Sequence, residues 1–164
     1  MKIFVPILCM MAFLFGLNAD DIDGFWKTVT EKNEKSYSVI AIYEYKGKRY
    51  GKIIATYANG VMKDNLYMPT NRAPGVFGNP FYCGMDMIWD LRKDGDRYKG
   101  KILDPEKGNL YNAELWVKDG KLVVRGKVLF IGKNQTWRPA EPSDFPKSFK
   151  MPDTKTFVPN IPQV

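Results

Sequence analysis

Short segments in which apolar and polar residues alternate, separated by tight turns, constrain this chain more than any other feature. In one of them the apolar residues Met85, Met87, Trp89 and Leu91 alternate with Asp86, Asp90 and Arg92. Alternation with a period of two is typical of a half-buried β-strand. Pairs such as Asp94-Gly95 and Asp119-Gly120 favour the tight turns that join two strands into a hairpin. The pattern therefore predicts an all-β chain whose strands follow one another through hairpins.

Counting the segments of this kind gives eight or nine strands. The expected ranges are a short strand at Trp26 and then 36–45, 49–57, 85–92, 97–103, 111–117, 122–130 and 135–138. An open sheet of that size would expose two edges, whereas an up-and-down barrel removes both. We therefore expect a single up-and-down antiparallel β-barrel of eight or nine strands, closed by its first and last strands.

Two parts of the chain break this rhythm. Residues 58–83 are rich in turn-forming pairs and are expected to be irregular, with at most a short strand at 66–68. A loop this long is often functional, so it is expected either to cover one end of the barrel or to gate a ligand. Residues 140–164 contain five prolines and no alternation. They predict an irregular Pro-rich C-terminal tail, either disordered or draped over the barrel as extended chain.

The first residues have the character of an export signal. Lys2 precedes an apolar run that ends at Leu17, and Ala19 is followed by two aspartates. This order predicts a signal peptide at 1–19, a barrel domain at 20–139 and the tail at 140–164. The apolar run is shorter than a membrane-spanning helix requires, so no stable membrane anchor is expected. The protein is expected to be exported, to the periplasm or outside the cell.

The composition excludes several kinds of chemistry. The chain has no histidine, which rules out Ser-His-Asp and Cys-His catalysis. No cofactor or metal is expected, and the protein is not expected to be an enzyme. Carboxylates could in principle form a glycosidase-like pair, although surface solubility is the favoured role of the candidates Asp86, Asp90, Asp104 and Glu114. The net charge of +7 comes from lysines interspersed with acids, without a nucleic-acid-binding motif, so no nucleic acid partner is expected.

One cysteine, Cys83, remains once the leader is removed. A single cysteine cannot form an internal disulfide, so it is expected to be a small buried residue. Its alternative use is an intermolecular disulfide. Both a monomer and a homodimer are therefore open.

A set of aromatic and methionine residues is expected to point into the barrel: Tyr43, Met87, Trp89, Tyr98, Tyr111 and Phe130. A barrel of eight strands either fills with its own side chains or holds one small ligand. At the closed end, Gly24 allows a close backbone approach, and Trp26 is expected to act as an apolar plug. We expect the guanidinium of Arg138, or as the alternative that of Arg125, to lie over the Trp26 indole.

Several motifs of the chain resemble known families. The Gly24-Phe25-Trp26 strand, with a late arginine, resembles the opening signature of lipocalins. Four blocks in order, over roughly residues 24–138, resemble a family of small secreted bacterial proteins known only as a domain of unknown function. The blocks are Gly24-Phe25-Trp26-Lys27-Thr28, Ile42-Tyr43-Glu44 with 47–53, Gly100-Lys101-Ile102-Leu103-Asp104-Pro105 with Gly108 and Tyr111, and Thr136-Trp137-Arg138. The resemblance implies a lipocalin-like barrel, a leader and no established activity. The chain departs from it at Asn109-Leu110 and in its Pro-rich tail.

These observations lead to two hypotheses about function. In the first, the protein binds a small, largely apolar or amphipathic ligand inside the barrel. In the second, the barrel is filled with side chains, and the protein acts without catalysis through a partner or a homodimer.

Overall fold

The computed structural model describes residues 21–28, 35–128 and 131–164, and the expected signal peptide and Phe130 lie outside these ranges. It contains nine strands followed by two short 3-10 helices. The elements are β1 (Gly24–Lys27), β2 (Tyr37–Tyr45), β3 (Lys48–Ala58), β4 (Val61–Asn65), β5 (Asp86–Asp94), β6 (Arg97–Leu103), β7 (Leu110–Lys118), β8 (Lys121–Val128), β9 (Ile131–Pro139), η1 (Pro142–Asp144) and η2 (Thr154–Thr156).

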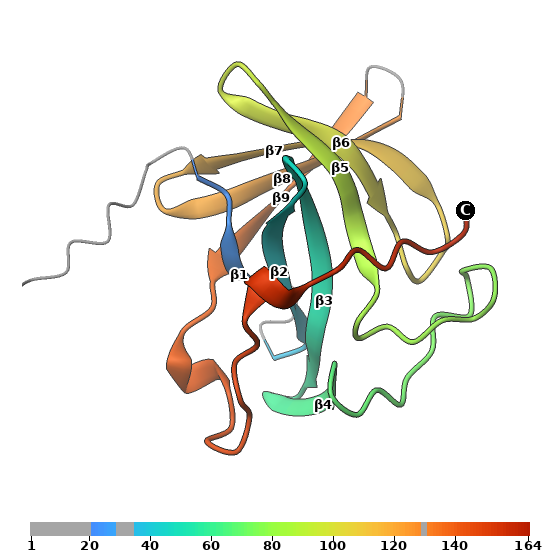
Figure 1. The fold of residues 1–164 in the computed structure, drawn as a ribbon, viewed down its shortest axis with the longest axis vertical. Helices are drawn as coiled ribbons and strands as arrows, with labels where there is room; N and C mark the ends of the chain where they lie inside the picture. Colours follow the sequence, from blue (N-terminus) through green and yellow to red (C-terminus); the bar gives the residue numbers. More distant parts are fainter. Residues whose placement is uncertain (1–20, 29–34, 129–130) are drawn as a thin grey trace, which may run out of the picture.

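The sheet closes on itself, as the alternation and the turns predict. The strand order is β2-β1-β9-β8-β7-β6-β5-β3-β4, and β2 also pairs with β3, so every strand except β4 belongs to a closed antiparallel barrel (Figure 1). The first strand pairs with the last, with Trp26 opposite Pro139 and Lys27 opposite Arg138. The predicted all-β, up-and-down barrel is therefore confirmed. The strand β4 lies outside this barrel and pairs with the C-terminal part of β3.

The expectation of a short strand at 66–68 was wrong, because β4 begins earlier, at Val61. Asn59 and Gly60 have positive φ angles of 53° and 76°, as in the hairpin turns that connect two strands directly. The chain therefore folds back at once, and Val61 pairs with Ala58 at the end of β3. After β4, residues 66–85 run as an irregular segment that contains one isolated bridge, between Arg72 and Phe81.

The C-terminal segment 140–164 is draped over the barrel as extended chain, which is one of the two expected arrangements. Figure 1 shows this segment, in red, lying across β2 and β3. Its residues Ala140, Phe145 and Phe157 pack against a cluster of buried side chains on the outer surface of the barrel. The prolines suit this role because they favour extended backbone and need no hydrogen-bond acceptor for an N–H group.

The covering segment buries the outer face of β2, so that both faces of this strand are apolar. Ile40 and Ile42 lie opposite Trp26 and Gly24 and belong to the interior cluster. Val39 and Ala41 belong to the outer cluster under the C-terminal segment. Since cross-strand partners share a face and neighbours alternate, Tyr43 also lies on the outer face. The expectation that Tyr43 points into the barrel was therefore wrong, because both faces of this strand are buried and its alternation does not mark the inner one.

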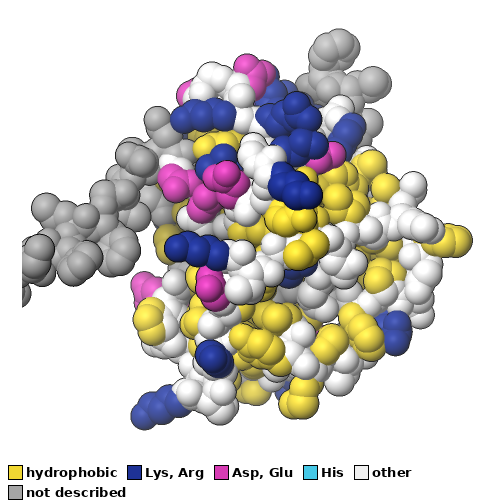
Figure 2. Space-filling model, viewed as in Figure 1, with side chains coloured by type: hydrophobic (Ala, Val, Ile, Leu, Met, Phe, Trp, Pro, Cys, Tyr) yellow, Lys and Arg dark blue, Asp and Glu magenta, His cyan; other side chains and the backbone are white. Residues whose placement is uncertain are grey.

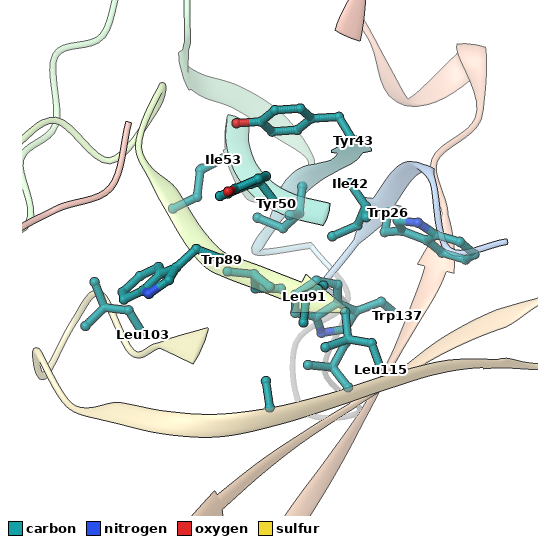
Figure 3. Close-up of a cluster of buried hydrophobic side chains, with 14 of the residues drawn as sticks. Trp26, Ile42, Tyr43, Tyr50, Ile53, Trp89, Leu91, Leu103, Leu115 and Trp137 are labelled. Atoms are coloured by element: carbon teal, nitrogen blue, oxygen red, sulfur yellow. The ribbon is translucent and has the colours of Figure 1, made fainter. Parts of the chain in front are cut away.

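Large apolar side chains fill the half of the barrel where β1 begins and β9 ends. Figure 3 shows Trp26, Ile42, Leu91, Leu115 and Trp137 converging there from several strands. Trp137 is only 1% exposed, and Leu91 and Leu115 are fully buried. We call this half the closed end; it also carries the β2–β3, β5–β6 and β7–β8 turns. The opposite half, with the β6–β7 turn and segment 66–85, is the mouth.

Basic and acidic side chains are mixed on the outside of the molecule. In the view of Figure 2, charged groups of both signs gather over the upper part, and hydrophobic side chains lie over the lower part. Close pairs such as Lys99 with Asp94, at 2.7 Å, and Lys48 with Asp90, at 3.0 Å, account for part of this mixture. Such exposed pairs contribute little to stability.

Candidate functional site

The mouth half of the barrel contains an open cavity of about 1160 Å³. Its wall is built from side chains of β3, β5, β6, β7, β8 and β9. The described strand residues that line it include Ile53, Met87, Ile102, Tyr111, Val124, Gly126, Gln135 and Trp137. Pockets that hold small ligands have volumes of this order and mostly apolar walls. The interior is therefore open at the mouth and packed at the closed end.

Gly126 is the residue on β8 that leaves room in the wall. It lies opposite Ala113 on one side and Lys133 on the other. A Cβ atom at this position would lie 3.7 Å from the Cβ of Tyr111 and 3.8 Å from the Cγ2 of Ile102. Those are ordinary contact distances, so a small side chain would fit, and a large one would extend into the cavity.

The inner face of β9 changes from apolar to charged toward the mouth. Trp137, Gln135 and Lys133 are two residues apart, so they share this face, and they lie opposite Leu122, Val124 and Gly126 in turn. The Trp137 indole N–H donates to the Gln135 side-chain oxygen at 3.1 Å. Lys133 is the member of this column nearest the mouth.

Charged residues of both signs surround the mouth: Arg72, Asp104, Glu106 and Lys107 all line the cavity. The guanidinium of Arg72 lies 3.8 Å from the centre of the Phe81 ring and donates to the Asn79 carbonyl oxygen at 3.0 Å. The Asp104 carboxylate accepts from the backbone N–H groups of Glu106 and Lys107 at 3.0 and 3.2 Å. Both hydrogen bonds stabilise the turn to which Asp104 itself belongs.

Only some of the side chains that we expected inside the barrel line the cavity. Met87 and Tyr111 line the cavity, and Phe130 lies outside the described residues. Tyr98 is 5% exposed and packs near the closed end, opposite Leu115. Trp89 lies opposite Lys101, which is exposed on the outer face, yet only 6% of Trp89 is accessible. It belongs to the same apolar cluster as Leu103 and as Ala73 and Val76 of segment 66–85.

Trp26 lies at the closed end as expected, but the guanidinium that enters this end is neither of the two that we expected. Trp26 is 7% exposed, and its indole N–H donates to the Ile22 carbonyl oxygen at 2.9 Å. Gly24, with a φ of 143°, lies in the strand beside it. By register, Arg138 shares the outer face with Lys27, whereas Trp26 points inward. Arg125 lies against Gly132, where any side chain would collide with its guanidinium.

Arg49 is the guanidinium that enters the closed end, and the sequence reading did not single it out. It lies 5.4 Å from the centre of the Tyr98 ring, and its Nε is 3.3 Å from the Asp23 carboxylate. Burial raises the pKa of Asp23, and the nearby Asp21 adds to this effect, while Arg49 opposes it. The available signal was the charge pair across the hairpin, because Arg49 lies directly opposite Glu44.

A second group of polar residues is buried on the outer face, under the C-terminal segment. Asp86 is fully buried and accepts from the Tyr43 hydroxyl at 2.8 Å, the Lys52 ammonium at 2.8 Å and the Asn160 backbone N–H at 2.6 Å. Burial, followed by the Asp86 charge, raises the pKa of Tyr43. Asp86 was expected to be a surface carboxylate, and this was wrong. Its acceptor capacity is occupied, so its role is structural.

Two classes of feature are absent from the residues that the structure describes. Among them, no three His, Cys, Asp or Glu side chains are grouped closely enough to hold a metal ion. Within the same ranges, no helix has the length and apolar character needed to cross a membrane.

Comparison with known proteins supports the barrel and names the family. Among solved structures, protein HP1028 from Helicobacter pylori, described as belonging to the lipocalin family, matches with a TM-score of 0.57 and 23% sequence identity. The match covers 76% of this chain and 86% of that protein, and it shows a shared fold. No curated protein matches the chain. Residues 24–138 match DUF2147, described as an uncharacterized protein conserved in bacteria, and the chain therefore belongs to the DUF2147 family.

Proposed function

We propose that this protein binds a small, largely apolar or amphipathic molecule in the cavity of its barrel and is not an enzyme. The observation that carries the proposal is the cavity of about 1160 Å³ behind the mouth, with Ile102, Tyr111 and Val124 in its wall. Moving an apolar surface from water onto such a wall is favourable by roughly 25 cal/mol for each Å² removed from water. The lipocalin-like fold supports the same role by analogy.

The cavity also supports the first of the two hypotheses drawn from the sequence over the second. A barrel filled with its own side chains would act through its outer surface or through a second copy. Here the side chains fill the closed end, and Gly126 leaves the wall open at the mouth. The geometry thus favours a ligand inside the barrel over the interaction protein with a filled lumen.

The proposal includes export to the periplasm or beyond the cell, with removal of residues 1–19. The order of a lysine, an apolar run and Ala19 supports this part of the proposal. N-terminal sequencing of the exported protein should then begin at or near Asp20. A mature product that retains Met1 would contradict export by this route.

A neutral fluorescent probe tests binding in the cavity. N-phenylnaphthylamine is apolar and uncharged, and its emission rises when it leaves water. We expect the wild type to bind it, with energy transfer from the tryptophans of the barrel. Gly126→Leu should weaken binding about tenfold or more because leucine occupies the cavity.

The matched control is Thr136→Leu, which adds the same side chain on the outer face of β9, opposite Val123. This variant should bind the probe as the wild type does. The proposal fails if the folded wild type binds no probe, or if both leucine variants bind it equally well.

Native mass spectrometry of protein from its own host gives a second test. A retained small molecule supports the ligand-binding protein, and a dimer without an adduct supports the interaction protein.

A further inference from the structure

The inner face of β9 contains the donors from which the chemistry of the ligand can be inferred. From the closed end toward the mouth it presents an indole, a carboxamide and an ammonium group, from Trp137, Gln135 and Lys133. Side chains two residues apart on a strand are separated by about 7 Å along its axis. The face thus changes from apolar to cationic over roughly 13 Å.

The Trp137 indole fixes the orientation of the Gln135 amide. An indole nitrogen can only donate a hydrogen bond, so its partner, 3.1 Å away, has to be the amide oxygen of Gln135. The amide NH₂ group, with its two donors, therefore points away from Trp137. Although Gln135 faces the interior, its side chain remains exposed to water through the open cavity. A ligand at this level therefore meets the two amide donors of Gln135.

Lys133 adds a positive charge at the next level of the same face. It lies opposite Gly126, which has no side chain to cover it. Within the part of the chain that the structure describes, the Lys133 ammonium has no hydrogen bond or ion pair. It is exposed, and it lines the cavity. An ammonium that is solvated in an open cavity can exchange its water for an anionic group.

The acids at the mouth offset the positive charge of the lining only in part. The Asp104 carboxylate accepts from two backbone N–H groups of its own turn. Lys107, in the same turn, offsets Glu106, and Arg72 adds another cation to the lining. The described charged residues of the lining are Arg72, Lys107 and Lys133 against Asp104 and Glu106. The lining thus has one more cation than acid, and Lys133 is the cation on the inner face of a strand.

We propose that the ligand is a compact amphiphilic anion, such as a carboxylate or sulfonate on an apolar group. Its charged group binds Lys133 and the Gln135 amide, and its apolar part points toward Trp137 and Val124. This inference rests on the proposed function, since it assigns a ligand class to the same cavity. The short distance between the Lys133 and Trp137 levels favours a ring system or a short chain over a long extended one.

Two probes that differ by one sulfonate test the assignment. Anilinonaphthalene sulfonate carries the anion, and N-phenylnaphthylamine has the same ring system without it. We expect the wild type to bind the sulfonate about tenfold more tightly than the neutral probe, which corresponds to about 1.4 kcal/mol. Salt should weaken the sulfonate complex and leave the neutral one unchanged.

Substitutions then locate the anion site. Lys133→Gln should remove most of the preference for the sulfonate while leaving the neutral probe bound, and Lys133→Arg should restore it. The matched control is Lys118→Gln, which removes one exposed lysine beside the β7–β8 turn at the closed end. That variant has the same net charge as Lys133→Gln and should retain the preference.

The outcomes separate the two proposals. If the folded wild type binds neither probe, the cavity is not a ligand site and both proposals fall. If it binds both probes equally, or if Lys118→Gln and Lys133→Gln lower the preference by the same factor, the ligand site stands and the anion site is refuted. Loss of the preference in Lys133→Gln alone, with recovery in Lys133→Arg, supports the assignment.

Discussion

The ammonium of Lys52 and the carboxylate of Asp86 form an ion pair at 2.8 Å on the outside of the barrel, and water reaches almost none of it. The two side chains are 7% and 0% exposed. The C-terminal segment closes the site, since Asn160 donates to Asp86 and the Val158 carbonyl oxygen accepts from Lys52 at 3.3 Å. A buried pair of this kind is retained only if its other hydrogen-bonding groups are satisfied, which the C-terminal segment provides.

Asp86→Asn should therefore destabilise the fold strongly. The substitution keeps the shape of the side chain but leaves the Lys52 ammonium buried without a counter-charge. We expect a loss of about 3–5 kcal/mol in the free energy of unfolding, measured by denaturant titration. Asp94→Asn, at a carboxylate that is 64% exposed beside Lys99, is the control and should change stability by less than about 0.5 kcal/mol. Equal effects of the two substitutions would contradict the structural role of Asp86.

Phe157 should anchor the C-terminal segment. Its ring meets the Tyr43 ring edge-on, with the ring centres 5.1 Å apart, and the Lys52 ammonium lies 5.6 Å from its centre. Phe157→Ala should lower stability by about 2 kcal/mol, less than at a fully buried site, and should speed amide exchange at Asp86 and Asn160. Val164→Ala, at a residue that is 66% exposed, should do neither. Unchanged exchange at Asp86 in Phe157→Ala would show that the segment is held elsewhere.

Glu114 should make stability depend on pH in a specific direction. Its carboxylate is 2.5 Å from the Lys127 ammonium and 2.7 Å from the Arg97 guanidinium, and the hydrogen bond from Lys127 lowers the pKa of Glu114 despite partial burial. A carboxyl whose pKa is lower in the folded state stabilises the fold above its unfolded pKa, and this contribution is lost as the pH falls through the folded pKa. Glu114→Gln should cost about 1 kcal/mol at neutral pH and almost nothing below the folded pKa. A cost that stays constant in acid would contradict the ion-pair origin.

Cys83 should react slowly in the folded protein. The thiol is 3% exposed, and burial, together with the charge of Asp64 and a hydrogen bond to it, raises its pKa to about 12. The reactive thiolate is therefore scarce at neutral pH, so labelling by a disulfide reagent should be about a hundredfold slower than in denaturant. A Cys83→Ala variant identifies the signal. Rapid labelling, or a disulfide-linked dimer that this variant loses, would restore the intermolecular role considered from the sequence.

The strands and the barrel could be predicted because their signals are local. Alternation along β7 and β8 reflects one buried and one exposed face, and Asp119-Gly120 specifies the turn between them. The same logic failed at β2 and β5, where a distant segment covers the outer face. Asp86 is the clearest case, because its partner Asn160 lies 74 residues further along the chain. No local sequence pattern indicates that a distant segment covers the outer face of a strand.

The candidate site was predictable only in part. Met87 and Tyr111 followed from their alternation with polar neighbours, and both line the cavity. Lys133 was missed because the residues of β9 are polar on both faces toward the mouth, which removes the contrast on which alternation depends. Counting back in steps of two from the buried Trp137 would have placed Gln135 and Lys133 on the inner face.

The β1–β9 ladder has a consequence for how the chain folds. Each hairpin joins neighbouring segments and can form early, because little loop entropy is lost when nearby strands pair. The barrel is complete only when Trp26 meets Pro139, after almost the whole domain has been ordered between them. The ladder is also short, and Pro139 has no N–H group to contribute to it. Pairing of β1 with β9, which closes the barrel, is therefore the late, non-local step of folding. Separation of these two strands is the easiest way for the barrel to begin to unfold.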